Sequence, residues 1–449
     1  MATLFGTDGI RGKANQYPIT ADIAIKTGQA VGRFVRDQGF SSIIIGKDTR
    51  LSGDMLESGV ASGIASTGVD VSLAGVIPTP GIAYLTRITS RTGAGVMISA
   101  SHNPYTDNGI KIFRHDGMKL DDEEEHRIES WILSQETDHG IDIGSIRVRP
   151  ELRTKYIDFL RSLFPKWKQA EAVRIVLDCS HGAASGIAKE VFHGEGIETT
   201  FIYNAPNGKN INDGCGSQHT QDLSRQVLAL QADIGFAFDG DADRMIAVDS
   251  QGREITGDAI LAICAKFAKQ KNQLKNNTLV STIMSNVGLS NTLTSLDIQH
   301  LTADVGDKRV LELMKQSNAC IGGEDSGHFI FLDHHTTGDG MLSAIKLLEV
   351  MNGTGQSLSE LASIMTVFPQ VLMNVEVDPS KPDFKQVDAI QDEIERVETA
   401  LGNKGRVLIR YSGTQPLLRV MVEGPEKDLT QAYAAQICKA IQLHLPKMN

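Results

Sequence analysis

The chain alternates between short apolar runs and segments in which apolar residues recur at helical spacing. Apolar runs predict strands at 42–46, 70–76 and 93–98. Residues 22–37, before the first of these strands, and residues 54–66, between the first two, carry apolar side chains on one face of a helix. Strands that alternate with helices in this way are typical of βαβ units with a parallel sheet. The first part of the chain is therefore predicted to have an α/β fold.

The same pattern restarts twice and then changes. Predicted strands at 173–178 and 278–284 begin a second and a third α/β segment. Near the C-terminus, strands are predicted at 370–377 and 406–411, with a helix at 393–401 between them, and a further strand is predicted at 420–423. A helix is predicted at 427–443. This last block is expected to be a smaller α+β domain.

The length of the chain requires several domains. Its 449 residues exceed what one hydrophobic core holds and suit three or four domains. Proline and glycine positions mark joints near residues 150, 252 and 368. The predicted domains are 1–150, 151–252 and 253–368, each α/β, and 369–449, which is α+β.

Composition narrows the classes of function. With 41% hydrophobic and 22% charged residues, the chain is typical of a globular protein. The net charge of -11 and the lack of a dense Lys/Arg run argue against nucleic acid or an anionic membrane as partner. No apolar stretch has spanning length, and residues 1–6 lack a signal-peptide core. The five scattered cysteines are typical of reduced thiols, so a cytoplasmic location is expected.

An acidic triplet is the most specific chemical signal in the chain. Asp239, Asp241 and Asp243 alternate with small residues between two predicted strands, 232–238 and 245–249. Carboxylates crowded at a strand end suit a hard divalent cation such as Mg²⁺. A calcium EF-hand is excluded because its loop needs a glycine, a glutamate and flanking helices that this segment lacks. A solvated acidic turn is the alternative, and the triplet alone does not decide between the two.

Two polar loops in the first domain offer further chemistry. The glycine-rich turn 6–13 presents Arg11, and its spacing departs from that of a nucleotide-binding Walker A loop. The segment SASHNP offers Ser99 or Ser101 as a nucleophile, without the GxSxG elbow of lipases. Lys111 stands on the strand expected to follow. Taken singly, each is also an ordinary turn or surface residue.

Two more polar loops lie in the C-terminal half. Residues 322–328 bring together Glu324, Ser326 and His328, groups that read sugar hydroxyls or an amine. A polar turn with a structural histidine is the alternative. The second loop has the arginines, hydroxyls and glycine amide that grip a phosphate, with a solvated hairpin as the alternative. Its candidate residues are Arg410, Ser412, Gly413, Thr414 and Arg419.

Taken together, these motifs resemble the α-D-phosphohexomutase superfamily. The resemblance extends nearly end to end, with the motifs in the same order. They are FGTDGIRG at 5–12, IIIGKDTRLSG at 43–53, PTP at 78–80, ISASHNPYTDNGIKIF at 98–113, FDGDADR at 238–244, GGEDSGH at 322–328, TTGDG at 336–340 and RYSGTQPLLRVMVEG at 410–424. The resemblance implies a heart-shaped molecule of four domains, three related α/β domains and a C-terminal α+β domain.

The resemblance also implies roles for individual residues. Ser101 would carry a phosphoryl group in the active enzyme. One Mg²⁺ per chain would be held by Ser101, Asp239, Asp241 and Asp243. The other implied catalytic residues are Arg11, Lys111 and His328. Sugar contacts are implied for Glu324 and Ser326. Contacts with the non-transferring phosphate are implied for Arg410, Ser412, Gly413, Thr414 and Arg419.

Within the superfamily, the chain is most similar to bacterial enzymes that act on glucosamine phosphates. The implied reaction interconverts glucosamine 6-phosphate and glucosamine 1-phosphate through a 1,6-bisphosphate, for UDP-GlcNAc and cell-wall precursors. A hexose 1,6-bisphosphate is the implied activator, and a homodimer is one candidate assembly. Two departures bear on selectivity: Gln415 replaces a usual glutamate, and Lys308-Arg309 replaces a usual Arg-Tyr pair. Mannose or glucose phosphates are the alternative substrates, and a phosphate-ester hydrolase and a non-catalytic binder are the alternative classes.

Overall fold

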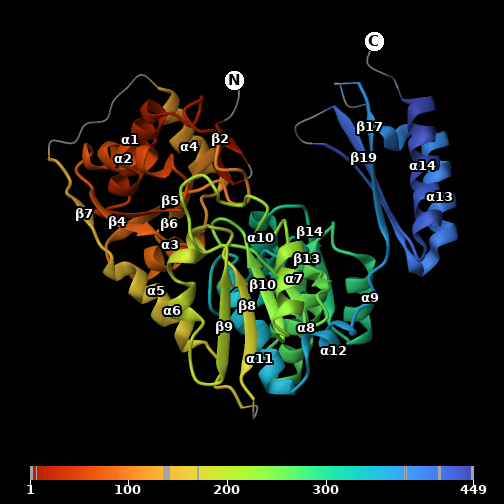
Figure 1. The fold of residues 1–449 in the computed structure, drawn as a ribbon. Coiled ribbons are helices and arrows are strands. Elements are labelled where there is room, and N and C mark those ends of the chain that lie inside the picture. The colour runs from red at the N-terminus through yellow and green to blue at the C-terminus, as the bar shows by residue number, and fades with distance from the viewer. Residues whose placement is uncertain are drawn as a thin grey trace. The chain divides into compact units, whose positions relative to one another are not determined.

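The structure is a computed structural model in which two compact units are distinct. It describes residues 4–6, 8–134, 142–168, 171–378, 380, 382–412 and 416–445. Unit 1 comprises Met1–Ile283 and Gln299–Ser363, and unit 2 comprises Met284–Ile298 and Ile364–Asn449. Four sheets occur in the described part of the chain, three in unit 1 and one in unit 2 (Figure 1).

The first sheet has the order β1-β2-β6-β5-β3-β4-β7. Its central strands β5, β3, β4 and β7 are parallel, whereas β6 and β2 are antiparallel to their neighbours. The strands are β1 (Phe5–Gly6), β2 (Gly9–Lys13), β3 (Ser42–Lys47), β4 (Asp70–Val76), β5 (Thr92–Ile98), β6 (Asp107–Arg114) and β7 (Ile146–Val148). The helices that accompany it are α1 (Ala21–Asp37), α2 (Gly53–Ala65), α3 (Thr79–Ile88), α4 (Asp122–Leu133) and α5 (Glu151–Ser162).

Helices cover both faces of this sheet (Figure 1). Because side chains alternate along a strand, Ile43, Ile45 and Val96 face one side, where they form a core with α1, α2 and α4. On the other side α3 packs closely. A Cβ at Gly95 would lie 2.1 Å from the Thr86 hydroxyl oxygen on α3. The carboxyl ends of the parallel strands are left free for polar loops.

The second and third sheets complete unit 1. The second has the order β12-β11-β10-β8-β9, and the third has the order β14-β13-β15-β16. Their strands are β8 (Val173–Asp178), β9 (Ile197–Ile202), β10 (Ile234–Phe238), β11 (Met245–Asp249), β12 (Glu254–Ile255), β13 (Thr278–Thr282), β14 (Gln299–Ala303), β15 (Ile321–Gly323) and β16 (Phe329–Phe331). Their helices are η1 (Ala183–Gly186), α6 (Ala188–Val191), α7 (Gln221–Ala229), α8 (Gly257–Gln270), η2 (Lys275–Asn277), α10 (Asp307–Ser317), α11 (Gly340–Thr354) and α12 (Leu358–Ala362).

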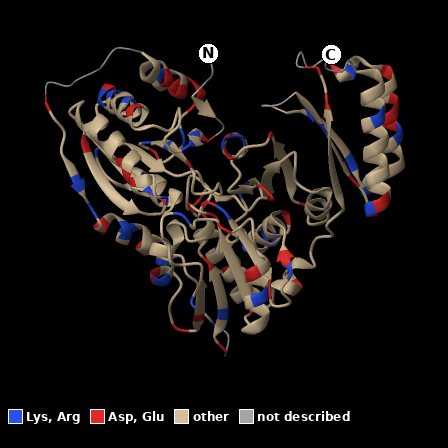
Figure 2. Cartoon of the chain, turned by 45° about the horizontal axis from the view of Figure 1, so that its top comes forward, with Lys and Arg blue, Asp and Glu red and all other residues tan. Residues whose placement is uncertain are grey.

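Unit 2 is built on an antiparallel sheet of order β17-β19-β18. Its elements are α9 (Val287–Ser295), β17 (Gln370–Glu376), η3 (Phe384–Gln386), α13 (Asp388–Leu401), η4 (Gly402–Lys404), β18 (Arg406–Tyr411), β19 (Leu417–Glu423) and α14 (Lys427–His444). Val375, Val420 and Ile437 belong to the core under α13 and α14, and this helix pair carries charges of both signs (Figure 2). Buried Glu423 accepts hydrogen bonds from Arg406 Nε (2.7 Å) and from the Val287 amide (3.0 Å). These bonds attach α9 to the sheet although it is distant in sequence.

The structure confirms the predicted α/β segments and the α+β block. Each predicted strand has a counterpart that agrees to within a few residues, such as β3 for 42–46 and β17 for 370–377. The division into 1–150, 151–252, 253–368 and 369–449 stays a prediction. No helix among the described residues is both long and apolar enough to cross a bilayer. The five cysteines are buried free thiols.

Candidate active site

Ser101 stands on the loop after β5, in a conformation that its neighbours enforce. Its φ of 52° lies in the left-handed region, which a serine occupies only when the surroundings stabilise it. The Ser101 carbonyl accepts hydrogen bonds from Arg50 Nη2 (2.8 Å) and Asn212 Nδ2 (2.9 Å). The hydroxyl donates to Asp239 Oδ2. The loop therefore aims this one hydroxyl at the acidic triplet.

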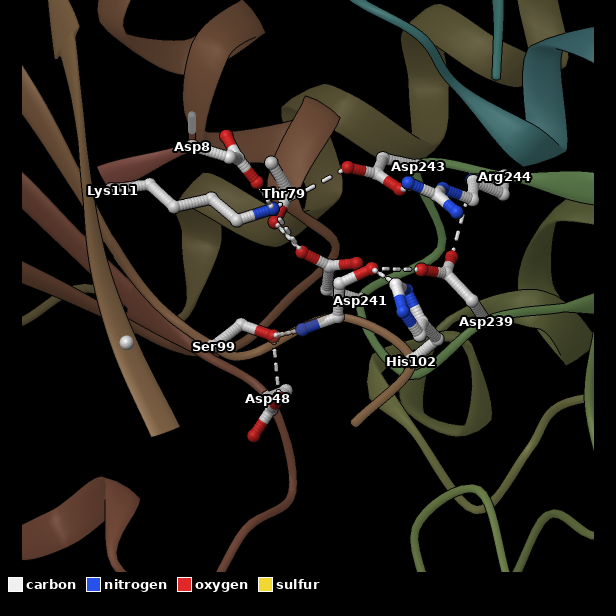
Figure 3. A network of polar contacts seen from close by, with 12 residues as sticks. Asp8, Asp48, Thr79, Ser99, His102, Lys111, Asp239, Asp241, Asp243 and Arg244 are labelled. Carbon is white, nitrogen blue, oxygen red and sulfur yellow. Dashed lines mark hydrogen bonds and ion pairs between the residues drawn. The ribbon is translucent and has the colours of Figure 1, made fainter. Parts of the chain in front are cut away.

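The structure distinguishes the two serines of this loop. Ser99 Oγ donates to buried Asp48 Oδ2 at 2.6 Å and accepts from the Ser101 amide at 2.9 Å (Figure 3). Its hydrogen-bonding capacity serves the loop itself. Ser101 Oγ instead meets the carboxylate cluster, with His102 Nδ1 3.4 Å away. Of the two candidates, Ser101 is the one placed for chemistry.

Arg50 is the main structural support of this loop, and the sequence did not single it out. Its guanidinium is buried and paired with Asp48 at 2.8 Å. The remaining N–H groups donate to four loop carbonyls, those of Ser101, Asn103, Pro104 and Asp107. A planar fork with five donors suits this task, which a lysine ammonium does not reproduce.

We therefore expect Arg50→Lys to lower kcat about 100-fold while the protein remains folded. Lysine keeps the charge beside Asp48, but the Ser101 loop loses its support, and small displacements of a reacting group cost rates of this order. Steady-state kinetics and a thermal melt measure the two effects. The matched control is Arg153→Lys, because Arg153 also donates to a carbonyl, that of Gly186, at the exposed edge of the unit. Wild-type kcat in Arg50→Lys would contradict this role.

The three aspartates occupy the turn between β10 and antiparallel β11. One ligand oxygen from each lies within 4.8 Å of the others, and all three residues are buried. Close packing against the serine loop fixes this turn, since a Cβ at Gly240 would meet the Ser101 carbonyl oxygen at 2.5 Å. Ala242, between two of the ligands, has a φ of 55°. The backbone therefore curls so that alternate side chains converge, as expected.

Two observations indicate that this cluster suits a divalent cation. Asp241 Oδ1 and Asp243 Oδ1 are buried without a hydrogen-bond partner, a costly state unless something binds them. Burial, together with Asp243 and Asp241, also raises the pKa of Asp239 well above its usual range. An all-oxygen set of this kind suits Mg²⁺. The side chains present therefore fit the metal, with Ser101 Oγ beside them.

Lys111 contacts the cluster directly, and Arg11 is linked to Lys111 through Asp8. The Lys111 ammonium is buried 2.8 Å from Asp241 Oδ2, 3.4 Å from Asp243 Oδ2 and 2.9 Å from Asp8 Oδ2 (Figure 3). Burial opposes its charge, but the three carboxylates raise the pKa of Lys111 well above its usual value. Arg11 pairs with Asp8 and is about one third exposed. Both side chains therefore present fixed positive charge.

The loop between β15 and β16 carries His328, Glu324 and Ser326, and it places His328 beside Asp243. The His328 imidazole is buried, with Nδ1 3.9 Å from Asp243 Oδ1 and Nε2 3.5 Å from Asp307 Oδ2. Burial lowers its pKa, but the two carboxylates outweigh burial and raise it. Glu324 Oε1 accepts from the Gly306 amide at 3.1 Å, and Ser326 is exposed.

The residues implied to bind the non-transferring phosphate, here called the phosphate clamp, belong to unit 2. Arg410 and Arg419 are register partners on β18 and β19, so two cationic side chains share one face of the sheet. Like charges placed opposite each other destabilise a sheet unless an anion compensates them. Arg419 Nε is buried without a hydrogen-bond partner, and Ser412 follows β18. Gly413 and Thr414 lie outside the described residues.

Several site residues were not singled out by the sequence argument. Thr79, at the start of α3, donates to Asp241 Oδ2 at 2.5 Å. Arg244 is about one quarter exposed, and its amide donates to Asp239 Oδ1 at 3.1 Å. Its Nε lacks a hydrogen-bond partner. The motifs PTP and DADR contained the signal, but only the fold shows what these side chains contact.

Comparison with known proteins identifies the family. Three successive α/β/α domains and a C-terminal domain of phosphoglucomutase/phosphomannomutase match residues 2–139, 154–252, 256–368 and 372–440. The chain belongs to the phosphoglucomutase/phosphomannomutase family. The family match covers the serine loop, the acidic turn, the β15–β16 loop and the β18–β19 segment, one in each matched domain.

Full-length relatives are similar at high identity. A protein of Desulforapulum autotrophicum named phosphoglucosamine mutase is 53% identical over 98% of this chain and 99% of its own length. A protein of Syntrophus aciditrophicus with the same name is 50% identical over 99% of this chain and 100% of its own.

Solved structures show the same fold at low identity. A phosphoglucomutase/phosphomannomutase family protein from Burkholderia thailandensis has a TM-score of 0.82 at 23% identity, covering 98% of this chain and 97% of that one. The N-acetylphosphoglucosamine mutase of Aspergillus fumigatus, solved with GlcNAc-6P and magnesium, has a TM-score of 0.67 at 16% identity. It covers 98% of this chain and 96% of that one.

Proposed function

We propose that this chain is a magnesium-dependent phosphohexomutase that interconverts glucosamine 6-phosphate and glucosamine 1-phosphate. The observation that carries the proposal is the Ser101 hydroxyl, which donates to Asp239 within a buried triplet of carboxylates. Full-length relatives named phosphoglucosamine mutase support the choice of substrate. The product would supply UDP-GlcNAc synthesis in the cytoplasm.

In the proposed cycle, phosphorylated Ser101 transfers its phosphoryl group to a sugar hydroxyl. The bond from Oγ to phosphorus breaks and a bond from the sugar oxygen to phosphorus forms. A base takes the proton of the sugar hydroxyl, and Ser101 Oγ gains a proton as it leaves. The three aspartates and a phosphate oxygen on Ser101 would hold Mg²⁺, which would withdraw charge from the transferring group. The sugar bisphosphate then turns end for end, and Ser101 takes back the other phosphoryl group. An added hexose 1,6-bisphosphate would restore phosphate to any serine that loses it.

The side chains around Ser101 suit this work. Lys111 and Arg11 are cations held in place by ion pairs, so they can stabilise the charge of a phosphoryl group without reorganising. Arg244 lies beside the same carboxylates, with its Nε 3.8 Å from Asp243 Oδ1 and not engaged in a hydrogen bond. The remaining proposed roles are proton transfer at His328, sugar contacts at Glu324 and Ser326, and phosphate binding at Arg410, Ser412, Gly413, Thr414 and Arg419.

A side-by-side assay tests this function. The protein is incubated with glucosamine, glucose and mannose 6-phosphates in turn, with Mg²⁺ and a catalytic amount of the matching 1,6-bisphosphate, and the 1-phosphates are quantified. We expect the highest kcat/KM with glucosamine 6-phosphate. A preference for mannose or glucose phosphate would overturn the substrate assignment, and release of inorganic phosphate in place of isomerisation would overturn the mutase itself.

Arg419→Ala separates a mutase from a hydrolase. Losing one charge-assisted contact costs roughly 1.5–3 kcal/mol, so KM should rise by about 10-fold or more. A weaker clamp also lets the bisphosphate escape before it turns, which leaves Ser101 without phosphate. Activity should then depend more steeply on added bisphosphate, measured as rate against activator concentration. The control is Arg396→Ala on exposed α13, and identical activator curves for Arg419→Ala and wild type would contradict a clamp role.

A further inference from the structure

Five ionisable side chains, alternately basic and acidic, link Lys111 to His328 through three residues that have no assigned role. They run in the order Lys111, Asp8, Lys119, Asp307, His328. Lys119 Nζ lies at the centre, 2.5 Å from Asp8 Oδ1 and in direct contact with Asp307 Oδ2. Asp8 then reaches Lys111 at 2.9 Å, and Asp307 Oδ2 lies 3.5 Å from His328 Nε2, which also accepts a hydrogen bond from the Gly338 amide at 3.2 Å.

Three separate segments of unit 1 supply the inner members of this chain of charges. Asp8 lies in the turn between β1 and β2, and Asp307 is the first residue of α10. Lys119 follows β6, where its backbone forms a β-bridge with Phe113. Lys119 therefore joins the first sheet to the third at the point where both approach the acidic turn.

These inner side chains are held firmly in their charged forms. The ammonium of Lys119 and the carboxylates of Asp8 and Asp307 are each less than one fifth exposed. Burial opposes ionisation at Asp8, but Lys111, Lys119 and Arg11 outweigh it and lower the pKa of Asp8 well below its usual range. Removing a lysine from between two buried carboxylates leaves them to repel each other, so both would move.

The neighbouring cations of α10 have different partners. Lys308 Nζ pairs with Asp122 at 2.6 Å and with Glu125 at 3.6 Å, both on the acidic first turn of α4. Arg309 also pairs with Asp122. Residues 119–125 therefore pair with the start of α10 twice, once through Lys119 and once through Lys308. The Lys308 pairs do not connect with Lys111 or His328. Lys308 and Arg309, which replace the usual Arg-Tyr pair, therefore form ion pairs with α4.

We propose that Lys119 is a positioning residue that holds Lys111 and His328 in register beside the acidic turn, acting through Asp8 and Asp307. The inference rests on the proposed mutase function, because it assigns work to Lys111 and His328. It identifies the link through which the first and third sheets of unit 1 share one catalytic geometry. A cavity of about 110 Å³ borders this link, lined among others by Lys119, Asp307 and His328, so the link stands beside accessible space.

Kinetics of Lys119→Met and Lys119→Arg test the proposal, with Lys308→Met as the matched control on the same contact. Lys119→Met should lower kcat about 100-fold and change the KM for glucosamine 6-phosphate by less than about threefold, because it displaces catalytic groups and removes no side chain proposed to contact the sugar or its non-transferring phosphate. Lys119→Arg keeps a cation between the carboxylates and should recover most of the lost rate. Lys308→Met breaks the ion pairs with α4 but not the link between Lys111 and His328, so its loss of kcat should be far smaller than that of Lys119→Met. A double variant, Lys119→Met with Asp307→Asn, should lose less than the product of the single losses, because both break one link.

Each outcome is decisive. A raised KM at unchanged kcat in Lys119→Met would make Lys119 a substrate contact and overturn the proposal. Equal losses in Lys119→Met and Lys308→Met would reduce it to a general packing role. If Lys119→Met does not fold, a Lys119→Arg variant that folds but remains as slow as Asp307→Asn would overturn it as well. Wild-type protein without mutase activity would refute the proposed function itself, which is a separate result.

Discussion

Replacing Ser101 with alanine is expected to reduce mutase activity below detection, a loss of more than about 10,000-fold. The alanine variant has no hydroxyl to carry a phosphoryl group between the two positions of the sugar, and no other hydroxyl takes its place. Ser99 cannot substitute, because its Oγ is engaged by Asp48 and by the Ser101 amide. Coupled detection of glucosamine 1-phosphate measures the rate.

Ser99→Ala is the matched control for this loss. It removes a loop hydrogen bond and should slow turnover, but Ser101 should still carry phosphate. Peptide mass spectrometry of both variants, after incubation with a 1,6-bisphosphate, shows where the phosphate resides. Near-wild-type turnover in Ser101→Ala, or phosphate on Ser99 in the wild-type protein, would refute the phosphoserine assignment.

Asp241→Asn is expected to cause the second large loss. The substitution removes one of three carboxylates that face the cation site, and it leaves Lys111 with one charged partner fewer. We expect weaker Mg²⁺ binding by calorimetry. Turnover should fall by more than the roughly 10- to 100-fold loss that follows substitution of a residue that only hydrogen-bonds a metal ligand. Chelation of the wild-type protein should abolish activity, and added Mg²⁺ should restore it.

Asp233→Asn is the control for this effect. Asp233 precedes the same strand, β10, at its other end, where it accepts a hydrogen bond from the Arg174 amide. An asparagine oxygen can accept that bond, so Mg²⁺ affinity and activity should remain at wild-type levels. Full activity in rigorously metal-free wild-type protein, or equal Mg²⁺ affinity in Asp241→Asn, would contradict a metal role for the triplet.

Much of the fold was predictable because local patterns determine it. The apolar run before Asp239 and the one after Arg244 became the antiparallel pair β10 and β11, so the acidic turn lies where the pattern placed it. The association of α9 with unit 2 was not predictable. It depends on Glu423, more than a hundred positions away, which binds the Val287 amide.

The functional site could likewise be predicted only in part from the sequence. The triplet and the SASHNP loop were visible as motifs, but the choice between Ser99 and Ser101 depends on which hydroxyl reaches Asp239, a contact across 138 positions. Lys119 gave no sequence signal, because its partners Asp8 and Asp307 are far away in the chain and meet it only in the fold. Isolated charged residues on turns look like solvated surface until their neighbours are known.

The most direct test follows a labelled phosphoryl group from Ser101. Wild-type protein is charged with radiolabelled phosphate from a 1,6-bisphosphate, freed of excess label and mixed with unlabelled glucosamine 6-phosphate and Mg²⁺. The account predicts that the label leaves the Ser101 peptide and appears in glucosamine bisphosphate and monophosphate. Label that is released only as inorganic phosphate, or that never attaches to Ser101, would contradict it.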